Sequence, residues 1–153
     1  MKKIIILLFI ATSFAASAQI QKPAKWTFTP PKTSAKVGQT VDLVFTAKID
    51  DNWYMYSSQL KVEGPMATTA IFTANDTYKV VGKLVPVKPH EKYDDIWGGK
   101  VQYFVKEATF IQKVKITKKN PVIEGKIECQ TCTIKDGSCV PNKDKFKFEV
   151  KTI

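Results

Sequence analysis

The chain contains no arginine, although it carries 24 lysines among its 153 residues. Proteins that read nucleic acid usually rely on arginine, because its planar guanidinium makes paired hydrogen bonds to bases and phosphates. Apart from Lys2 and Lys3, the lysines are spread from Lys22 to Lys151 and often alternate with apolar residues, so most of the net charge of +10 belongs to a solvated surface. We therefore expect no nucleic acid partner.

Long apolar segments are also scarce. The apolar run at residues 4–10 follows Lys2 and Lys3 and is too short to span a bilayer, which needs about 20 residues. Small residues come next and end in the A-S-A sequence at 16–18, which fits the cleavage site of a secretory signal. The pattern predicts a signal peptide over residues 1–18 and a mature protein, residues 19–153, in the periplasm or secreted.

A sustained helical stripe is missing as well, and apolar residues instead recur at every second position. This alternation is clear at 41–49, 110–116 and 146–150, where lysines or other polar residues occupy the opposite face. Further strand candidates, rich in Val, Ile, Thr and aromatic residues, are 26–29, 53–62, 68–73, 78–85, 101–105 and 122–129. About nine short strands separated by turn residues predict an all-β, immunoglobulin-like β-sandwich that forms one domain.

Cysteine is rare, but the three cysteines lie close together, as Cys129, Cys132 and Cys139. Neighbouring cysteines in an exported protein tend to be oxidised. The turn sequence Asp136-Gly137 can bring Cys132 and Cys139 together at the end of a β-hairpin. By the chain-entropy estimate, closing so short a loop stabilises the fold by only about 2.5 kcal/mol. A domain of this size folds without such a staple, so the bond suits redox exchange, while a static structural disulfide remains the alternative.

Metal binding is a third reading of the cysteines. Together with His90, the only histidine, they would make a Cys₃His zinc set. A second matched pair is missing, however, and we expect His90 to lie in a loop after Pro89, so we predict no metal and no other cofactor. The role of Cys129 stays open: it could end a strand as a small apolar residue, pair with Cys132 as C-x-x-C, or join two chains.

The cysteine segment resembles a known family. Q-T-C at 130–132 followed by C-V-P at 139–141 is similar to the active-site hairpin of the N-terminal periplasmic domain of the thiol:disulfide interchange protein DsbD, a Q-x-C…C-x-P pattern on an immunoglobulin-like sandwich. W-Y-M-Y at 53–56 resembles the family's aromatic strand, which places two tyrosines beside the cysteines. Y-D-D-I-W-G at 93–98 resembles its cap loop, where an acidic pair precedes an apolar residue that shields the disulfide.

The chain departs from the family pattern in several places. Six residues instead of five separate the paired cysteines, Cys129 is additional, and Ile96 or Trp97 stands where the family has phenylalanine. The family's domain is normally followed by a membrane domain and a thioredoxin-like domain, whereas this chain ends at Ile153. The hairpin chemistry can carry over, and the resemblance leaves the source of electrons open.

The resemblance implies an exported thiol–disulfide exchange protein, not a conventional substrate-turnover enzyme. Its partners would be a thioredoxin-like reductant and oxidised periplasmic proteins, with a membrane-embedded electron donor as a further possibility. In this reading Cys139 meets the partner and Cys132 resolves the mixed disulfide. The other implied site residues are two tyrosines near the sulfurs, two acids that exchange protons and two cap residues: Tyr54, Tyr56, Asp94, Asp95, Ile96 and Trp97. The rival class is an immunoglobulin-like binding or structural module with a static disulfide.

Overall fold

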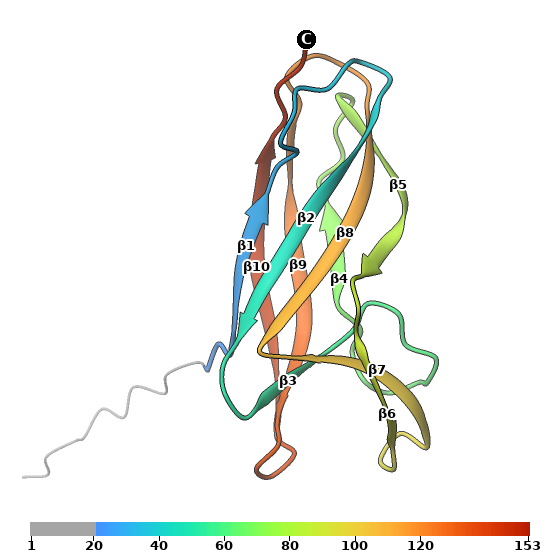
Figure 1. The fold of residues 1–153 in the computed structure, drawn as a ribbon, viewed down its shortest axis with the longest axis vertical. Coiled ribbons are helices and arrows are strands. Elements are labelled where there is room, and N and C mark those ends of the chain that lie inside the picture. The colour runs from blue at the N-terminus through green and yellow to red at the C-terminus, as the bar shows by residue number, and fades with distance from the viewer. Residues whose placement is uncertain (1–20) are drawn as a thin grey trace, which may run out of the picture.

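The computed structural model describes residues 21–153, so the predicted signal peptide lies outside the described residues. This part of the chain forms ten strands and no helix (Figure 1). Accordingly, the described segment holds no helix that could cross a membrane. The prediction of an all-β chain is confirmed.

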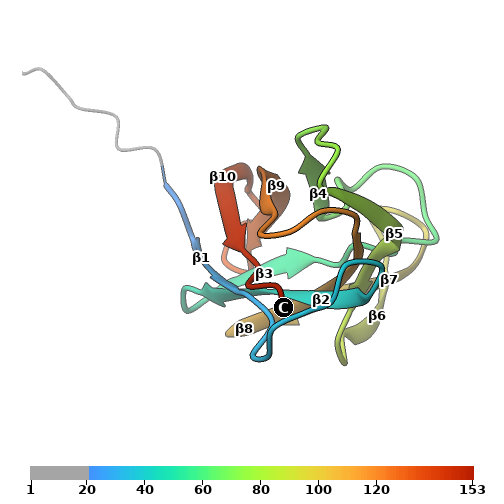
Figure 2. The same ribbon diagram turned by 90° about the horizontal axis from the view of Figure 1, so that it is seen from above.

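The strands form two antiparallel sheets that face each other as a sandwich (Figures 1 and 2). The first sheet has the order β1 (Ala24–Thr29), β2 (Thr40–Ile49), β8 (Glu107–Ile116) and β5 (Tyr78–Pro86). The second has the order β10 (Cys139–Glu149), β9 (Val122–Thr133), β3 (Trp53–Tyr56), β7 (Gly99–Val105) and β6 (His90–Asp94), and β4 (Thr69–Phe72) also pairs with β9.

The main core fills the space between the sheets and follows from the alternation seen in the sequence. On β2, Leu43 and Phe45 are fully buried, and on the facing sheet Phe146 and Phe148 point inward from β10. The ring of Phe45 lies 5.1 Å from the ring centres of both Phe146 and Phe148. Each such buried side chain contributes about 1.5–3 kcal/mol, so this core, and not the cysteine hairpin, holds the sandwich together.

The predicted strand at 53–62 is wrong beyond Tyr56. The backbone N–H of Ser57 still bonds to the Gln102 carbonyl at 2.9 Å, after which the chain leaves the sheet and returns where the Thr68 N–H reaches the Ser57 carbonyl. The alternating Leu60 and Val62 in between do not form a strand, because they pack as a loop against the second sheet. Their pattern reflects burial of this loop, which we call the covering loop (residues 57–68).

Two further expectations near the site are corrected. His90 does not lie in a loop but begins strand β6, after Lys88 turns the chain with a φ of 52° and Pro89 follows. Strand β9 continues to Thr133, so Cys129 lies within this strand and does not end it. Figure 1 shows the result: the β9–β10 hairpin and the β6–β7 hairpin project from the same end of the sandwich, away from the C-terminus.

Candidate functional site

Cys132 and Cys139 form a disulfide across the β9–β10 hairpin and lie directly opposite each other in its register. The Thr133 N–H donates to the Ser138 carbonyl at 2.9 Å. Because hydrogen-bonded and non-bonded pairs alternate in antiparallel strands, the cysteines occupy the next, non-bonded position, where two strands approach most closely. Their Cα atoms are 4.0 Å apart. The sequence prediction of a hairpin that joins these two cysteines is confirmed.

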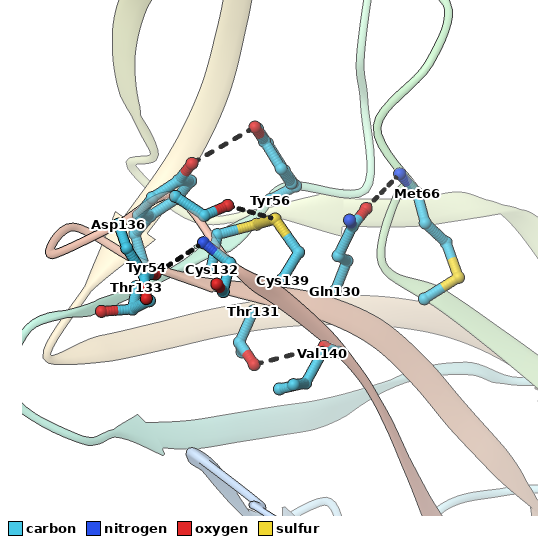
Figure 3. Close-up of a disulfide and its surroundings, with 12 residues drawn as sticks. Tyr54, Tyr56, Met66, Gln130, Thr131, Cys132, Thr133, Asp136, Cys139 and Val140 are labelled. Carbon is cyan, nitrogen blue, oxygen red and sulfur yellow. Dashed lines mark hydrogen bonds between the residues drawn. A yellow bond between two sulfur atoms is a disulfide. The ribbon is translucent and has the colours of Figure 1, made fainter.

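The turn between the cysteines is closed by its own polar residues (Figure 3). Oδ1 of Asp136 accepts a hydrogen bond from the Ser138 N–H at 2.9 Å. That bond holds the pKa of the Asp136 carboxyl below its usual value. Gly137 adopts a φ of 76°, a left-handed conformation that glycine takes without steric cost. The local sequence therefore favours a tight turn, and the Ile134 N–H, which donates to the Asn52 carbonyl at 2.9 Å, ties this turn to the segment before β3.

The two sulfurs differ in access to solvent. Cys132 has an exposed fraction of 0%, whereas Cys139 is exposed. The difference follows from the sheet order, because β10 lies at the edge of the sheet while β9 is covered by β10 on one side and by β3 on the other. Cys139 is therefore the more accessible cysteine of the pair.

The disulfide belongs to a small cluster that is separate from the main core. Cys132 packs with Tyr56 and Val101 on the outer face of the second sheet. Neighbouring residues on the same strands, such as Thr131 and Met55, pair with each other in register and point the opposite way, with Met55 in the main core. Since successive side chains of a strand alternate between faces, the bond can open without disturbing the packing between the sheets.

The two predicted tyrosines lie in this cluster. Tyr54 on β3 is directly opposite Cys132 on β9. Its hydroxyl lies 3.4 Å from the Tyr56 hydroxyl (Figure 3). Burial, followed by the hydrogen bond to Tyr56, raises the pKa of Tyr54 well above its ordinary value. Either hydroxyl of this pair can be the donor in the contact between them.

Of the two cap candidates, Trp97 covers the cluster and Ile96 does not. Trp97 packs against the buried group beside Leu60 and Val62, and its Nε1–H donates to the Tyr56 hydroxyl at 3.0 Å. Ile96 is 80% exposed. The covering loop approaches the Trp97 ring so closely that a Cβ at Gly64 would lie 2.1 Å from it. Only glycine fits beneath this ring.

The acidic pair is divided between two environments. Asp94 ends β6 with only 6% of its surface exposed, and its Oδ1 accepts a hydrogen bond from the Ile96 N–H at 3.1 Å. Nζ of Lys92 lies 3.4 Å from Oδ2 of Asp94 and 4.5 Å from the centre of the Tyr54 ring, so this lysine links the carboxylate to the tyrosine pair. Asp95 is exposed. The structure therefore brings Asp94, and not Asp95, to the cluster.

Sequence reasoning missed Lys92. Its Nζ lies 4.5 Å from the ring centre of Tyr54, 5.4 Å from that of Tyr103 and 3.4 Å from Oδ2 of Asp94. The available signal was the spacing of Lys92 and Asp94, which share a face if residues 90–94 form a strand. The predicted loop around His90 hides this spacing, because a loop has no fixed faces.

The open alternatives for Cys129 are resolved by its position. Cys129 is fully buried in the main core, opposite Asn142, on the face of β9 that points away from Cys132. It can neither pair with Cys132 nor reach a second chain. Burial raises the pKa of its thiol to about 12. Residues 21–153 include no group of three or more His, Cys, Asp or Glu side chains that could hold a metal ion, and His90 packs against Tyr103 with ring centres 5.6 Å apart.

Comparisons with known proteins agree with this geometry. Residues 18–151 match the family model described as thiol:disulfide interchange protein DsbD, N-terminal. Among solved structures, the reduced DsbD N-terminal domain of Neisseria meningitidis is 19% identical with a TM-score of 0.50, over 77% of this chain and 81% of that one. The N-terminal periplasmic domain of ScsB from Proteus mirabilis is 18% identical with a TM-score of 0.61, over 85% of this chain and 47% of that one.

A third solved structure contains the complex between the DsbD N-terminal and PilB N-terminal domains of Neisseria meningitidis; it is 17% identical with a TM-score of 0.50, over 78% of this chain and 80% of that one. At these identities the solved structures establish the fold alone, which confirms the predicted immunoglobulin-like sandwich. No curated protein sequence matches the chain at a significant level.

Proposed function

Because the chain belongs to the family of DsbD N-terminal domains, we propose that it exchanges thiols and disulfides through Cys132 and Cys139 in the periplasm. The observation that carries the proposal is the asymmetric bond, in which an exposed sulfur at a sheet edge is joined to a buried one. The periplasmic origin of the ScsB domain supports the location. The predicted signal peptide points the same way.

The exchange proceeds in two displacements. A thiolate of a dithiol protein attacks the Cys139 sulfur, the bond between the cysteines breaks, and Cys132 leaves as a thiolate that takes up a proton. The partner's second thiolate then attacks the partner's first sulfur, which is bonded to Cys139 in the mixed disulfide. Cys139 leaves as a thiolate and is protonated. The partner ends as a disulfide, and two electrons and two protons have passed to the cysteine pair. The reduced pair passes them on when the Cys139 thiolate attacks an oxidised protein and Cys132 resolves the product.

The surrounding residues have distinct roles in this scheme. Tyr54, protonated and opposite Cys132, donates a hydrogen bond to the leaving sulfur or to its water. Asp94 is the proton-exchanging acid, because Lys92 links its buried carboxylate to the Tyr54 ring, whereas Asp95 is exposed. Trp97 shields the buried side of the bond until a partner displaces the cap. Ile96 is exposed and is the cap residue that an approaching protein meets first. The role of Asp95 stays a prediction from the family resemblance.

The proposed reductant is a thioredoxin-like dithiol protein, and the proposed acceptors are oxidised periplasmic proteins. A partner of this kind carries a reactive sulfur on its own surface and needs one exposed target, which Cys139 provides. The complex that the Neisseria DsbD N-terminal domain forms with a PilB domain supports a protein partner. We also propose a membrane-embedded electron donor, which reduces the thioredoxin-like protein again after each exchange.

Trapping tests the scheme with matched variants. Both are made in a Cys129→Ala background, so that one free thiol remains in each. The probe is a thioredoxin that lacks its resolving cysteine and whose remaining cysteine is activated as a mixed disulfide with a small leaving thiol. Cys132→Ser should form a stable mixed disulfide with this probe through the exposed Cys139. Cys139→Ser, which keeps only the buried Cys132, should form little. Equal trapping by both variants would reject the assigned order of attack.

The rival function, a binding module with a static disulfide, predicts a different result for the wild-type protein. Mild dithiol reductant should then leave the bond intact, or its reduction should unfold the chain. Thiol labelling before and after reduction, followed by a melting curve, separates the two functions. Easy reduction of a protein that stays folded supports exchange.

A further inference from the structure

The exchange scheme requires a negative charge to form on a completely buried sulfur. When Cys139 is attacked, the electron pair of the broken bond moves to Cys132, whose exposed fraction is 0%. A charge that forms out of water is costly, and a leaving thiol with a higher pKa leaves more slowly. The residues assigned to the site from the family pattern offer no cation to offset this cost. Asp94 adds a buried negative charge nearby.

Lys92 is the cation that the fold brings to this place. It lies on β6, and its Nζ contacts the faces of the Tyr54 and Tyr103 rings at 4.5 and 5.4 Å from their centres. The same atom is 3.4 Å from Oδ2 of Asp94. Tyr54 in turn lies directly opposite Cys132. One aromatic side chain therefore separates the ammonium from the strand position of the leaving sulfur.

These contacts differ from those of an ordinary surface ion pair. Lys100, on the neighbouring strand β7, pairs with Glu91 at 3.2 Å, but its side chain is 70% exposed. The Lys92 side chain is 37% exposed and its carboxylate partner only 6%. Within residues 21–153, the two cation–ring contacts found both involve Lys92. Partial burial against two ring faces strengthens such contacts relative to an exposed pair.

We propose that Lys92 is a positioning residue of the disulfide site, which fixes Tyr54 beside Cys132 and neutralises Asp94. This inference rests on the exchange function proposed above. Without the ammonium, the Asp94 carboxylate would be an unpaired charge beside a site where a second negative charge must form. Lys92 touches neither sulfur in this scheme and acts through the two side chains that it holds.

The charged and titratable groups of the surrounding elements complete the electrostatic picture. The covering loop and the hairpin turn contribute exposed groups only, so solvent screens their effect on Cys132. By element, the groups are Tyr54 and Tyr56 on β3, Lys61 and Glu63 in the covering loop, His90, Lys92 and Asp94 on β6, Tyr103 on β7, Lys135 and Asp136 in the turn, and Cys139 on β10.

The test compares three lysine variants of the full mature chain. Lys92→Gln removes the charge, Lys92→Arg keeps it, and Lys100→Gln removes one charge from the same hairpin as a matched control. Reduction of the disulfide by dithiothreitol at fixed pH should slow about tenfold in Lys92→Gln, as expected for a partly buried charge near a developing one. Lys92→Arg and Lys100→Gln should stay near the wild-type rate, and all unfolding midpoints should remain similar.

A second readout addresses the leaving sulfur itself. In Cys139→Ser with Cys129→Ala, the ultraviolet absorbance difference from the same protein with Cys132→Ser added reports the Cys132 thiolate without the tyrosines. Adding Lys92→Gln should move the titration of Cys132 to higher pH. Tyr103→Leu removes one ring contact of Lys92 but keeps the ammonium, so it should slow reduction less than Lys92→Gln does. An unchanged reduction rate in Lys92→Gln, or an equal slowing in Lys100→Gln, overturns the proposed role of Lys92 but leaves the exchange function standing. A wild-type disulfide that resists reduction overturns both this inference and the exchange function.

Discussion

Cys132 lies directly opposite Cys139 in the β9–β10 register, yet Cys132 is completely buried while Cys139 is exposed. The same bond therefore offers one sulfur to solvent and keeps the other within the protein. It also lies on the outer face of its sheet, away from the aromatic core. This arrangement leads to separate expectations for stability, for access to the bond and for the third cysteine.

Reduction of the disulfide should leave the sandwich folded. The bond closes a short loop, so its loss should lower the free energy of unfolding by no more than about 2.5 kcal/mol. Urea unfolding of the oxidised and reduced forms measures the difference. As a control, Phe45→Ala in the main core should cost about 3–5 kcal/mol. A reduced form without a cooperative transition would contradict the separation of the two clusters.

The hydrogen bond from Trp97 to Tyr56 should hold the cap closed. Trp97→Phe keeps an aromatic ring but loses the N–H donor, and a hydrogen bond of this kind contributes about 0.5–1.5 kcal/mol. Reduction by dithiothreitol should therefore become about two- to tenfold faster. Tyr56→Phe should raise the reduction rate by a similar factor, and the double variant should be reduced no faster than either single variant. Slower reduction in Tyr56→Phe would mean that its hydroxyl acts on the sulfurs and not on the cap.

Gly64 should control the position of Trp97. In Gly64→Ala the new Cβ would fall 2.1 Å from the Trp97 ring at a φ of 121°, so the ring must move and the backbone is strained. We expect faster disulfide reduction together with lower stability. Gly82→Ala is the matched control, because its φ is 70° but nothing lies within 4 Å of the new Cβ. It should lose stability without a change in the reduction rate, and rapid-mixing kinetics with thermal melts checks both.

The buried Cys129 thiol should make stability depend on alkaline pH. Its pKa is about 12 in the fold, against about 8.5 in an unfolded chain. Between these values the folded state binds more protons than the unfolded state, so stability falls as pH rises, by up to about 1.4 kcal/mol per pH unit. At pH values below the pKa of the unfolded chain's cysteine, the Cys129 thiol makes its full contribution to the free energy of unfolding.

Comparison with Cys129→Ala isolates this effect from other groups that titrate in the same range, including Tyr54. The wild-type protein, with its disulfide intact, should show a steeper loss of unfolding free energy above about pH 8.5 than the variant. Denaturant titrations at a series of pH values measure the two slopes. Parallel slopes would show that the thiol ionises as readily in the fold as in the unfolded chain.

Local sequence predicted those parts of the site that depend on neighbours in the chain. The hairpin followed from Asp136-Gly137 between two cysteines, and the shared face of Tyr54 and Tyr56 followed from their spacing. The predicted strand at 53–62 was wrong beyond Tyr56, because alternating apolar residues fit a loop packed on a sheet as well as a strand. Residues such as Leu60 alternate like a strand but pack as a loop over the outer face of the sheet.

The sequence alone determined that the chain would form a sandwich of alternating strands and that Cys132 and Cys139 could close one hairpin, because both depend on side-chain alternation and turn chemistry within a few residues. Only the tertiary structure decided which sulfur is buried, that Trp97 rests on Gly64, and that Lys92 reaches Tyr54. These contacts join segments far apart in the chain. Their register is set by how the strands pair and how the loops pack, which no local pattern specifies.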